Sequence, residues 1–265
     1  MKPKLVIVGS AGRMGRRILS AAVDTGLFEI IAAVEKKDHP DIGKDAGIVA
    51  CGKTLNVKIT GDWPAGADVV IDFSQPQAAD ESIDYCLNSK TALVMGTTGL
   101  TAEQHEKIKS ASSQIPILYS TNTSLGMNVL FALVGKTASM LGEDYDTEIV
   151  EQHHRFKKDA PSGSAITLAE NICKATGRDS SSTVIFGRYG RDALRRKGQI
   201  AVHSVRAGDI TGVHSVIFST TGETITLNHT AHSLDSFAKG AVAAASWLVG
   251  KKPALYSMAD VLDIK

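Results

Sequence analysis

Two histidines, an arginine and two lysines lie within residues 153–158, and this group of cationic donors is the chain's strongest chemical signal. The group leads into Pro161-Ser162-Gly163-Ser164, a composition typical of a helix start. A helix N-terminus offers free N–H groups and a positive dipole to an anion. Cationic side chains beside such an end therefore predict a site for a substrate that carries carboxylate or phosphate groups. Alone, either half would be read as a charged loop or a helix cap.

The same segment is a poor candidate for a metal site. His153 and His154 are adjacent and lack the i, i+4 spacing of zinc proteases. On a strand, adjacent side chains point to opposite faces of the sheet. We therefore expect no bound metal.

A second signal is the glycine-rich stretch Gly9-Ser10-Ala11-Gly12-Arg13-Met14-Gly15 at the end of an apolar run. Its spacing is one residue longer than the G-x-G-x-x-G pattern that brings a pyrophosphate to a helix N-terminus. Glu35 follows Gly15 by twenty residues, at the end of the next apolar run, where it can bind ribose hydroxyls. This context favours dinucleotide binding over a βα loop with glycines for packing alone.

Charges near Glu35 leave the cofactor open between NADH and NADPH. Glu35 favours a free ribose 2′-hydroxyl, whereas Lys36, Lys37 and Arg13 can hold a 2′-phosphate. The other interpretation of Lys36 and Lys37 is a solvated turn. Two further turns, Gly96-Thr97-Thr98-Gly99 and Ser120-Thr121-Asn122-Thr123, follow apolar runs and can meet a nicotinamide, although each alone is typical of turns and caps.

The elements that must position these residues change character near residue 124. Before it, apolar strands alternate with helices, which indicates a parallel sheet buried on both faces and a doubly wound, Rossmann-like α/β fold. The expected strands are residues 5–8, 28–34, 68–73, 92–95 and 115–119. Beyond it, a helix over 124–141, a strand over 147–150 and a helix after Pro161 precede strands without helices between them, which predicts an α+β domain on a mixed sheet. Those strands are residues 183–186, 199–205, 213–219 and 223–228.

Composition excludes several classes of protein. The 265 residues carry a net charge of +1 and only 5% aromatic residues, so we expect no nucleic acid partner. Three cysteines without close spacing suit a reducing cytoplasm. The apolar run that ends at Gly9 is too short for a signal peptide or a membrane span, so we expect no membrane partner either.

Taken together, the motifs resemble the 4-hydroxy-tetrahydrodipicolinate (dihydrodipicolinate) reductase family of bacterial and plant lysine biosynthesis. The likeness runs over essentially the whole chain, and its histidine–lysine segment is highly diagnostic. It rests, in family order, on residues 12–15, 96–99, 153–165, 205–210, His214, 223–229 and 237–241.

The resemblance implies two domains and a homotetramer. Residues 1–124 bind the dinucleotide and are completed by residues 234–265, while residues 125–233 bind a small cyclic dicarboxylate and form the oligomer. His153 and Lys157 are then the catalytic pair, and His154, Gly163 and Ser164 hold substrate carboxylates. Cofactor contacts fall on Gly9, Ser10, Ala11, Gly12, Arg13, Met14, Glu35, Lys36, Gly96, Thr97, Thr98, Ser120, Thr121, Asn122 and Thr123.

This chain departs from the family at three positions. Ser164 replaces a usual threonine and keeps its hydroxyl, and Phe156 stands where many members have histidine. Gln75 replaces a frequent arginine, which weakens the case for a strong NADPH preference. The expected function is NAD(P)H-dependent reduction of 4-hydroxy-tetrahydrodipicolinate. The alternatives are another two-domain NAD(P)-dependent dehydrogenase and a nucleotide sensor without turnover.

Overall fold

The computed structural model describes residues 1–264, and these divide into two compact units. Unit 1 comprises residues 1–125 and the stretch from Leu234 onward, and unit 2 comprises residues 126–233. The functional roles that the family resemblance implies for two domains remain predictions.

Unit 1 is built on a sheet of seven parallel strands in the order β12-β6-β5-β4-β1-β2-β3. The interior strand β1 alternates its apolar side chains between two cores, with Leu5 and Ile7 in one and Val6 and Val8 in the other. Burial on both faces explains why the strands read as continuous apolar runs. The strands are β1 (Lys4–Val8), β2 (Glu29–Val34), β3 (Ile59–Thr60), β4 (Val69–Asp72), β5 (Ala92–Met95), β6 (Pro116–Tyr119) and β12 (Ala254–Tyr256).

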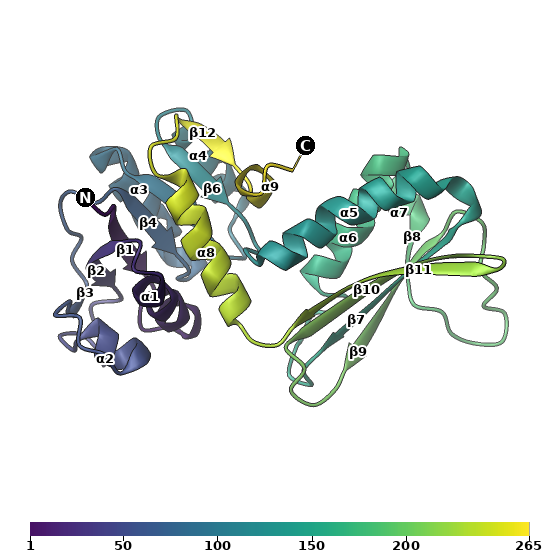
Figure 1. Ribbon diagram of the computed structural model, residues 1–265, viewed down its shortest axis with the longest axis horizontal. Helices are drawn as coiled ribbons and strands as arrows, with labels where there is room; N and C mark the ends of the chain where they lie inside the picture. The colour runs from purple at the N-terminus through teal and green to yellow at the C-terminus, as the bar shows by residue number, and fades with distance from the viewer. Residues whose placement is uncertain (265) are drawn as a thin grey trace. The chain divides into compact units, whose positions relative to one another are not determined.

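Helices cover both faces of this sheet, which confirms the doubly wound α/β architecture (Figure 1). Helices α1 (Arg13–Thr25) and α8 (Asp235–Leu248) pack together on one face. Helices α3 (Ala79–Ser89) and α4 (Ala102–Ala111) pack on the other, with the 3₁₀ turn η1 (Pro76–Ala78) preceding α3.

Two helix ends are set by residues close in the chain. Gly26 ends α1 in the left-handed conformation, with φ of 61°, and Thr101 with Gln104 forms a capping box at the start of α4. Short elements were not predicted, namely α2 (Ala46–Cys51), β3, β12 and α9 (Met258–Val261). They are too short for a periodic signal, and β12 depends on pairing with β6 for its existence.

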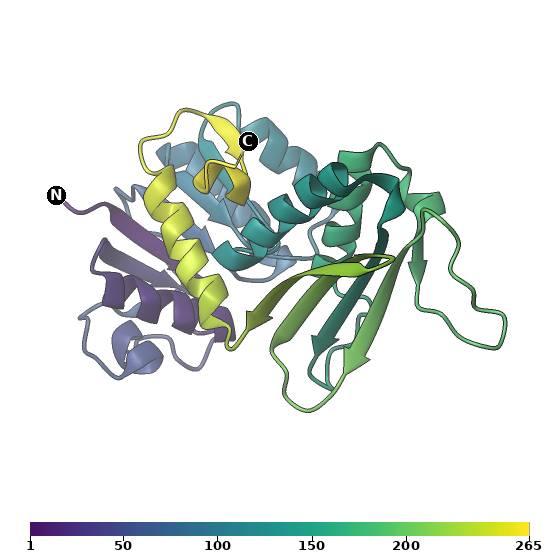
Figure 2. The same cartoon turned by 45° about the vertical axis from the view of Figure 1, so that its right-hand side comes forward.

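Unit 2 is a five-stranded mixed sheet in the order β11-β10-β7-β9-β8, as predicted. Helices α5 (Leu125–Leu141) and α6 (Gly163–Thr176) cover one face and form its core with the sheet (Figure 2). A 3₁₀ turn η2 and a short helix α7 complete the unit. The strands are β7 (Asp146–His153), β8 (Val184–Phe186), β9 (Ile200–Arg206), β10 (Gly212–Thr220) and β11 (Glu223–Ala231), with η2 at Gly142–Asp144 and α7 at Ser180–Thr183.

The strand expected over 147–150 is longer than predicted. The pairing of β7 with β9 continues as far as His153 opposite Arg206. Glu151 and His153 lie on the buried side of the strand, where hydrogen bonds satisfy them, so their polarity gave a false strand end. On β10, Val216 and Phe218 lie on the buried face, whereas Val213 lies on the opposite face, because alternate positions of a strand share a face.

Within residues 1–264, one helical stretch is long and apolar enough to cross a membrane by length and composition. It runs over Leu125–Asp144 with a mean hydropathy of 1.3. A single helix of this kind is weak evidence, because core helices of soluble proteins have the same properties. Met127, Leu130 and Val134 of this helix are buried in the core of unit 2.

Candidate functional site

The glycine-rich turn of unit 1 joins β1 to α1 through close backbone contacts. Gly9 has φ of 71°, and the N–H groups of Gly9 and Ser10 donate to the carbonyl of Val34 at 3.0 and 3.2 Å. A Cβ atom on Gly9 would lie 2.9 Å from Cα of Ser74, and one on Gly15 would lie 2.0 Å from the Gly9 oxygen. Both positions therefore require glycine, and the turn is held against the ends of two strands.

The start of α1 is arranged to receive an anion. Its N-cap residue, Gly12, provides no side-chain cap, so the first N–H groups of the helix are left for a ligand. Glu35, which follows β2, accepts a hydrogen bond from the N–H of Ala11 at 3.1 Å. The carboxylate is thus fixed beside the turn, as the dinucleotide interpretation requires.

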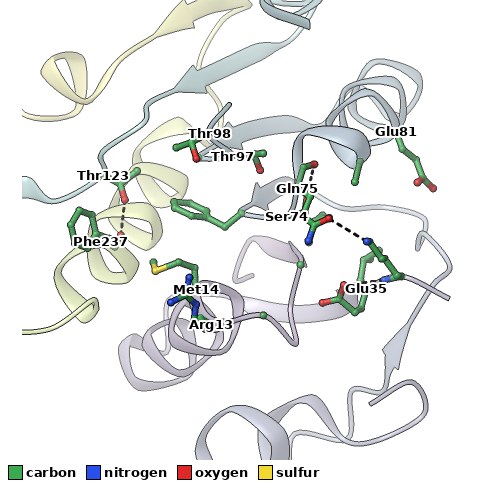
Figure 3. A pocket seen from close by; sticks show the side chains of 18 of the residues that line it. Arg13, Met14, Glu35, Ser74, Gln75, Glu81, Thr97, Thr98, Thr123 and Phe237 are labelled. Carbon is green, nitrogen blue, oxygen red and sulfur yellow. Dashed lines mark hydrogen bonds between the residues drawn. The ribbon is translucent and has the colours of Figure 1, made fainter. Parts of the chain in front are cut away.

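This turn lines a cavity of about 740 Å³ within unit 1 (Figure 3). Most of the predicted cofactor contacts line it, namely Gly9, Gly12, Arg13, Met14, Glu35, Lys36, Gly96, Thr97, Thr98, Thr121 and Thr123. Ser10 and Ala11 are instead buried in the turn. Ser120 and Asn122 do not line the cavity but shape the loop after β6, where the Ser120 hydroxyl donates to the Asn122 carbonyl at 2.8 Å.

A buried carboxylate holds two of the strand ends that line the cavity. Asp72, at the end of β4, accepts hydrogen bonds from the Thr97 hydroxyl at 3.0 Å and from the Ser74 N–H at 2.8 Å. The neighbouring Gly96 lies so close to Phe73 that a Cβ atom would be 2.2 Å from the ring. Thr97 therefore has a fixed place on the cavity wall.

Sequence reasoning missed the wall that α8 contributes. Leu234 and Phe237 line the cavity, more than a hundred residues after the last predicted contact. The Thr123 hydroxyl donates to the Phe237 carbonyl at 2.7 Å, and a Cβ atom on Gly240 would lie 1.7 Å from the Thr123 oxygen. Only the family resemblance predicted that residues 234–265 complete this domain, and it did not name Leu234 or Phe237 as residues that line the cavity.

A lysine and a glutamine meet on the cavity wall beyond Glu35. The Lys36 ammonium donates to Oε1 of Gln75 at 3.2 Å (Figure 3). The amide holds the ammonium in place without neutralising it, so Lys36 can bind an anion.

In unit 2, the fully buried Glu151 holds several parts of the predicted substrate segment together. Arg206 donates to its two oxygens at 3.0 and 2.8 Å, and the Ser162 N–H donates to Oε1 at 3.1 Å. Oε2 is also hydrogen-bonded to Nδ1 of His153. Burial works to raise the pKa of Glu151, but Arg206 and the other hydrogen bonds outweigh it and lower the pKa to about 2. The carboxylate is therefore charged at neutral pH.

The imidazole of His153 is uncharged at neutral pH. Burial is the main cause that lowers its pKa, although Glu151 opposes the shift and the charges of Lys157 and Arg206 add to it. An ionised carboxylate can only accept, so Nδ1 of His153 carries the proton of their hydrogen bond. Nε2 is then an acceptor.

A second buried histidine packs against His153. The ring of His214 lies edge-on to it, with centroids 5.2 Å apart, and its Nε2 is 3.2 Å from the Ser162 hydroxyl. Burial, aided by the neighbouring His153, lowers the pKa of His214 to about 4. Two neutral imidazoles therefore adjoin the start of α6.

The loop between β7 and α6 carries the remaining predicted residues. The Lys157 N–H donates to the His154 carbonyl at 3.1 Å, and the Lys157 ammonium pairs with Asp159 at 2.9 Å. Arg206 donates to the Asp159 carbonyl at 2.6 Å, which ties the loop to β9. Lys158 is exposed.

The predicted helix start after Pro161 is present. Ser162 is its N-cap and accepts from the N–H of Ala165 at 3.3 Å, while Gly163 and Ser164 begin α6. The structure thus brings the residues predicted for substrate into one segment of unit 2. It adds Glu151, Arg206 and His214 to this segment's surroundings. Glu151 could have been found from the sequence, because its i, i+2 spacing from His153 places both side chains on one face of the strand.

The described residues, 1–264, contain no group of three or more histidine, cysteine, aspartate or glutamate side chains placed to hold a metal ion.

Two family models match this chain. The model described as dihydrodipicolinate reductase, N-terminus, matches residues 3–123, and the model for the C-terminus matches residues 126–262. Among curated proteins, the 4-hydroxy-tetrahydrodipicolinate reductase of Trichlorobacter lovleyi is 43% identical over 99% of both chains. That of Syntrophus aciditrophicus is 41% identical over the same share of each.

Solved structures show the same fold. A dihydrodipicolinate reductase from a Paenisporosarcina species, described as dipicolinate-bound, aligns with a TM-score of 0.72 and 23% identity, over 97% of this chain and 98% of that one. An amine dehydrogenase from Mycobacterium smegmatis aligns with a TM-score of 0.58 and 14% identity, over 97% of this chain and 95% of that one.

Removing the charge of Glu151 tests the network around it. We expect Glu151→Gln to lower the free energy of unfolding by about 3–5 kcal/mol at neutral pH, because the partly buried Arg206 loses its counter-ion. Glu151 has a pKa of about 2 in the folded protein against an ordinary value of 4.5, so its contribution to stability is present above pH 4.5 and is lost as the pH falls towards 2. The difference between wild type and variant should therefore shrink over that range.

Urea unfolding followed by circular dichroism at several pH values measures this difference. The matched control is Glu143→Gln, which changes an exposed glutamate and should stay within about 0.5 kcal/mol of wild type. A difference in the free energy of unfolding between wild type and Glu151→Gln that is the same at all pH values would contradict the lowered pKa of Glu151.

Proposed function

The chain belongs to the dihydrodipicolinate reductase family, and we propose on this premise that it reduces 4-hydroxy-tetrahydrodipicolinate to tetrahydrodipicolinate with a nicotinamide dinucleotide. This step lies in the diaminopimelate route to lysine. The observation that carries the proposal is the match of both family halves across nearly the whole chain, joined by relatives of 41–43% identity over their full length.

The cavity of unit 1 fits the cofactor. The uncapped start of α1 suits a pyrophosphate, Glu35 suits the adenosine ribose, and the glycines allow the backbone to approach closely. Thr97, Thr98 and Thr123 supply hydroxyls on the opposite wall for the nicotinamide end. When bound, the cofactor supplies the hydride.

In unit 2, the segment after β7 is proposed to bind the dicarboxylate. His154, Gly163 and Ser164 hold the carboxylates at the start of α6, where the helix dipole is positive. Glu151 and Arg206 neutralise each other, and Asp159 pairs with Lys157, so the positive charge that attracts the substrate is the net charge of the whole loop. The Glu151–Arg206 pair positions this loop and does not itself bind substrate.

Lys157 and His153 are proposed to manage the proton. Loss of the 4-hydroxyl as water leaves a conjugated C=C–C=N system. Hydride adds to the outer carbon of its C=C bond, and a proton must then be added to the inner carbon so that the C=N bond is restored. The Lys157 ammonium attracts the dianion and donates that proton. His153, held neutral with Nε2 as an acceptor, orients the donor or relays the proton.

An oxidation assay with NADH or NADPH and freshly made substrate tests the proposal, with pyridine-2,6-dicarboxylate as inhibitor. Turnover with either cofactor, inhibited by the dicarboxylate, supports it. Binding of nucleotide without turnover would favour a sensor, and turnover only on a sugar or amino acid would favour another dehydrogenase.

We also propose a homotetramer that assembles through unit 2, because extended sheets tend to hide their edges or open faces by pairing. Light scattering that showed a monomer at assay concentrations would refute it.

The role of Lys157 predicts a large loss of turnover in Lys157→Ala. We expect kcat to fall at least about a hundredfold, since a positioned general acid is commonly worth about 10²–10⁴ in rate, while NADPH affinity hardly changes. Steady-state kinetics measure both. The control is Lys158→Ala, which changes the exposed neighbour and should lower kcat only slightly.

The double variant His153→Ala with Lys157→Ala should cost much less than the product of the single losses, because groups that act as one unit are not additive. If Lys157→Ala kept near-normal turnover at saturating substrate, the lysine would only anchor the substrate. The proton would then come from His153 or water.

We propose that both NADH and NADPH are used, within roughly tenfold of each other. Lys36 faces the cavity and is held by Gln75, so Lys36→Ala should raise the KM for NADPH and leave that for NADH nearly unchanged. Lys109→Ala, an exposed lysine of α4 away from the cavity, is the control. An equal loss for both cofactors would show that Lys36 does not bind the 2′-phosphate.

A further inference from the structure

A tryptophan and a glutamate line the cavity of unit 1 without a role in the proposed function. Trp63 lies in the segment before β4, Glu81 lies in the first turn of α3, and Nε1 of Trp63 donates to Oε1 of Glu81 at 2.7 Å. Figure 3 shows Glu81 on the same side of the cavity as Glu35, whereas Phe237 lies on the opposite side.

Both side chains are held in place before any ligand arrives. The indole ring of Trp63 stacks on Tyr85, with centroids 4.4 Å apart and an interplanar angle of 23°. The Tyr85 hydroxyl donates to the Pro64 carbonyl at 2.9 Å, which fixes the backbone next to Trp63. The indole N–H then anchors one oxygen of Glu81, and its other oxygen stays available as an acceptor.

The position of Glu35 shows which end of a dinucleotide would reach this pair. In the proposed function, Glu35 binds the ribose of the adenosine half, and the pyrophosphate lies at the start of α1. The adenine base is attached to that ribose and must lie beyond it, away from Thr98 and Phe237. Glu81 lies at this end of the cavity (Figure 3), and Trp63, which also lines the cavity, is hydrogen-bonded to it.

We propose that Glu81, anchored by Trp63, recognises the 6-amino group of the adenine base. The inference rests on the proposed function and adds the group that selects the base. An ionised carboxylate only accepts hydrogen bonds, so it suits the amino group of adenine. The 6-oxo group of hypoxanthine is also an acceptor, so it is repelled by the carboxylate. Glu81 would thereby distinguish two dinucleotides that differ only at the 6-position of the purine.

Isothermal titration calorimetry with two ligands tests this recognition without reliance on turnover. The probes are NADH and reduced nicotinamide hypoxanthine dinucleotide, which differ at the 6-position of the purine. We expect the wild-type protein to bind NADH about tenfold more tightly, a modest factor because Glu81 is exposed and its hydrogen bond competes with water.

Glu81→Gln should remove or reverse this preference. The amide oxygen can keep the bond from the Trp63 indole, and the amide NH₂ then meets the base as a donor, which suits a 6-oxo group and opposes a 6-amino group. Glu106→Gln, an exposed glutamate of α4 outside the cavity, is the control and should keep the wild-type preference.

The outcomes separate this inference from the proposed function. Equal affinity of the wild type for the two dinucleotides, or an unchanged preference in a folded Glu81→Gln protein, would overturn the role of Glu81 and leave the reductase assignment intact. Failure of the folded wild type to bind either dinucleotide would overturn the assignment of the cavity itself, and this inference with it.

Discussion

The fully buried carboxylate of Glu151 is the contact on which the candidate substrate site depends. A buried charge costs several kcal/mol unless charges and hydrogen bonds compensate it. Here Arg206, His153 and the Ser162 backbone all converge on it, from β9, from β7 and from the start of α6. The pairing of β7 with β9 thereby fixes the loop that holds Lys157. Because Glu151 and Arg206 neutralise each other, the charge that remains to attract a dianionic substrate is that of the loop.

The cavity of unit 1 depends on a different constraint, the close approach of backbone to backbone. Gly9 and Gly15 lie too near other main-chain atoms to carry a side chain, and Gly240 brings α8 against the Thr123 carbonyl. These contacts join segments from both ends of the chain around one cavity. The proposed cofactor site is therefore built from close-packed elements, and the charged side chains Glu35 and Lys36 also line it.

Features that depend on residues close together in the chain could be predicted from the sequence, whereas features that join distant residues could not. The five longer strands of unit 1 and the helix ends at Gly26 and Thr101 could be predicted because apolar runs and caps are local. The wall at Phe237 and the pair of Trp63 with Glu81 were not, because they join residues distant in the chain. Ser120 and Asn122 had suitable types, yet their hydrogen bond to each other shapes the loop instead of the cavity. The roles of the site residues remain predictions.

The protonation of His153 tests the dependence on Glu151 most directly. Long-range ¹H–¹⁵N correlation spectra of the histidine rings, assigned with a His153→Gln variant, distinguish the two neutral tautomers from the imidazolium. At neutral pH we predict an uncharged ring protonated at Nδ1, because burial lowers its pKa and the ionised Glu151 accepts its proton. A ring protonated at Nε2 alone, or a charged ring, would contradict the account.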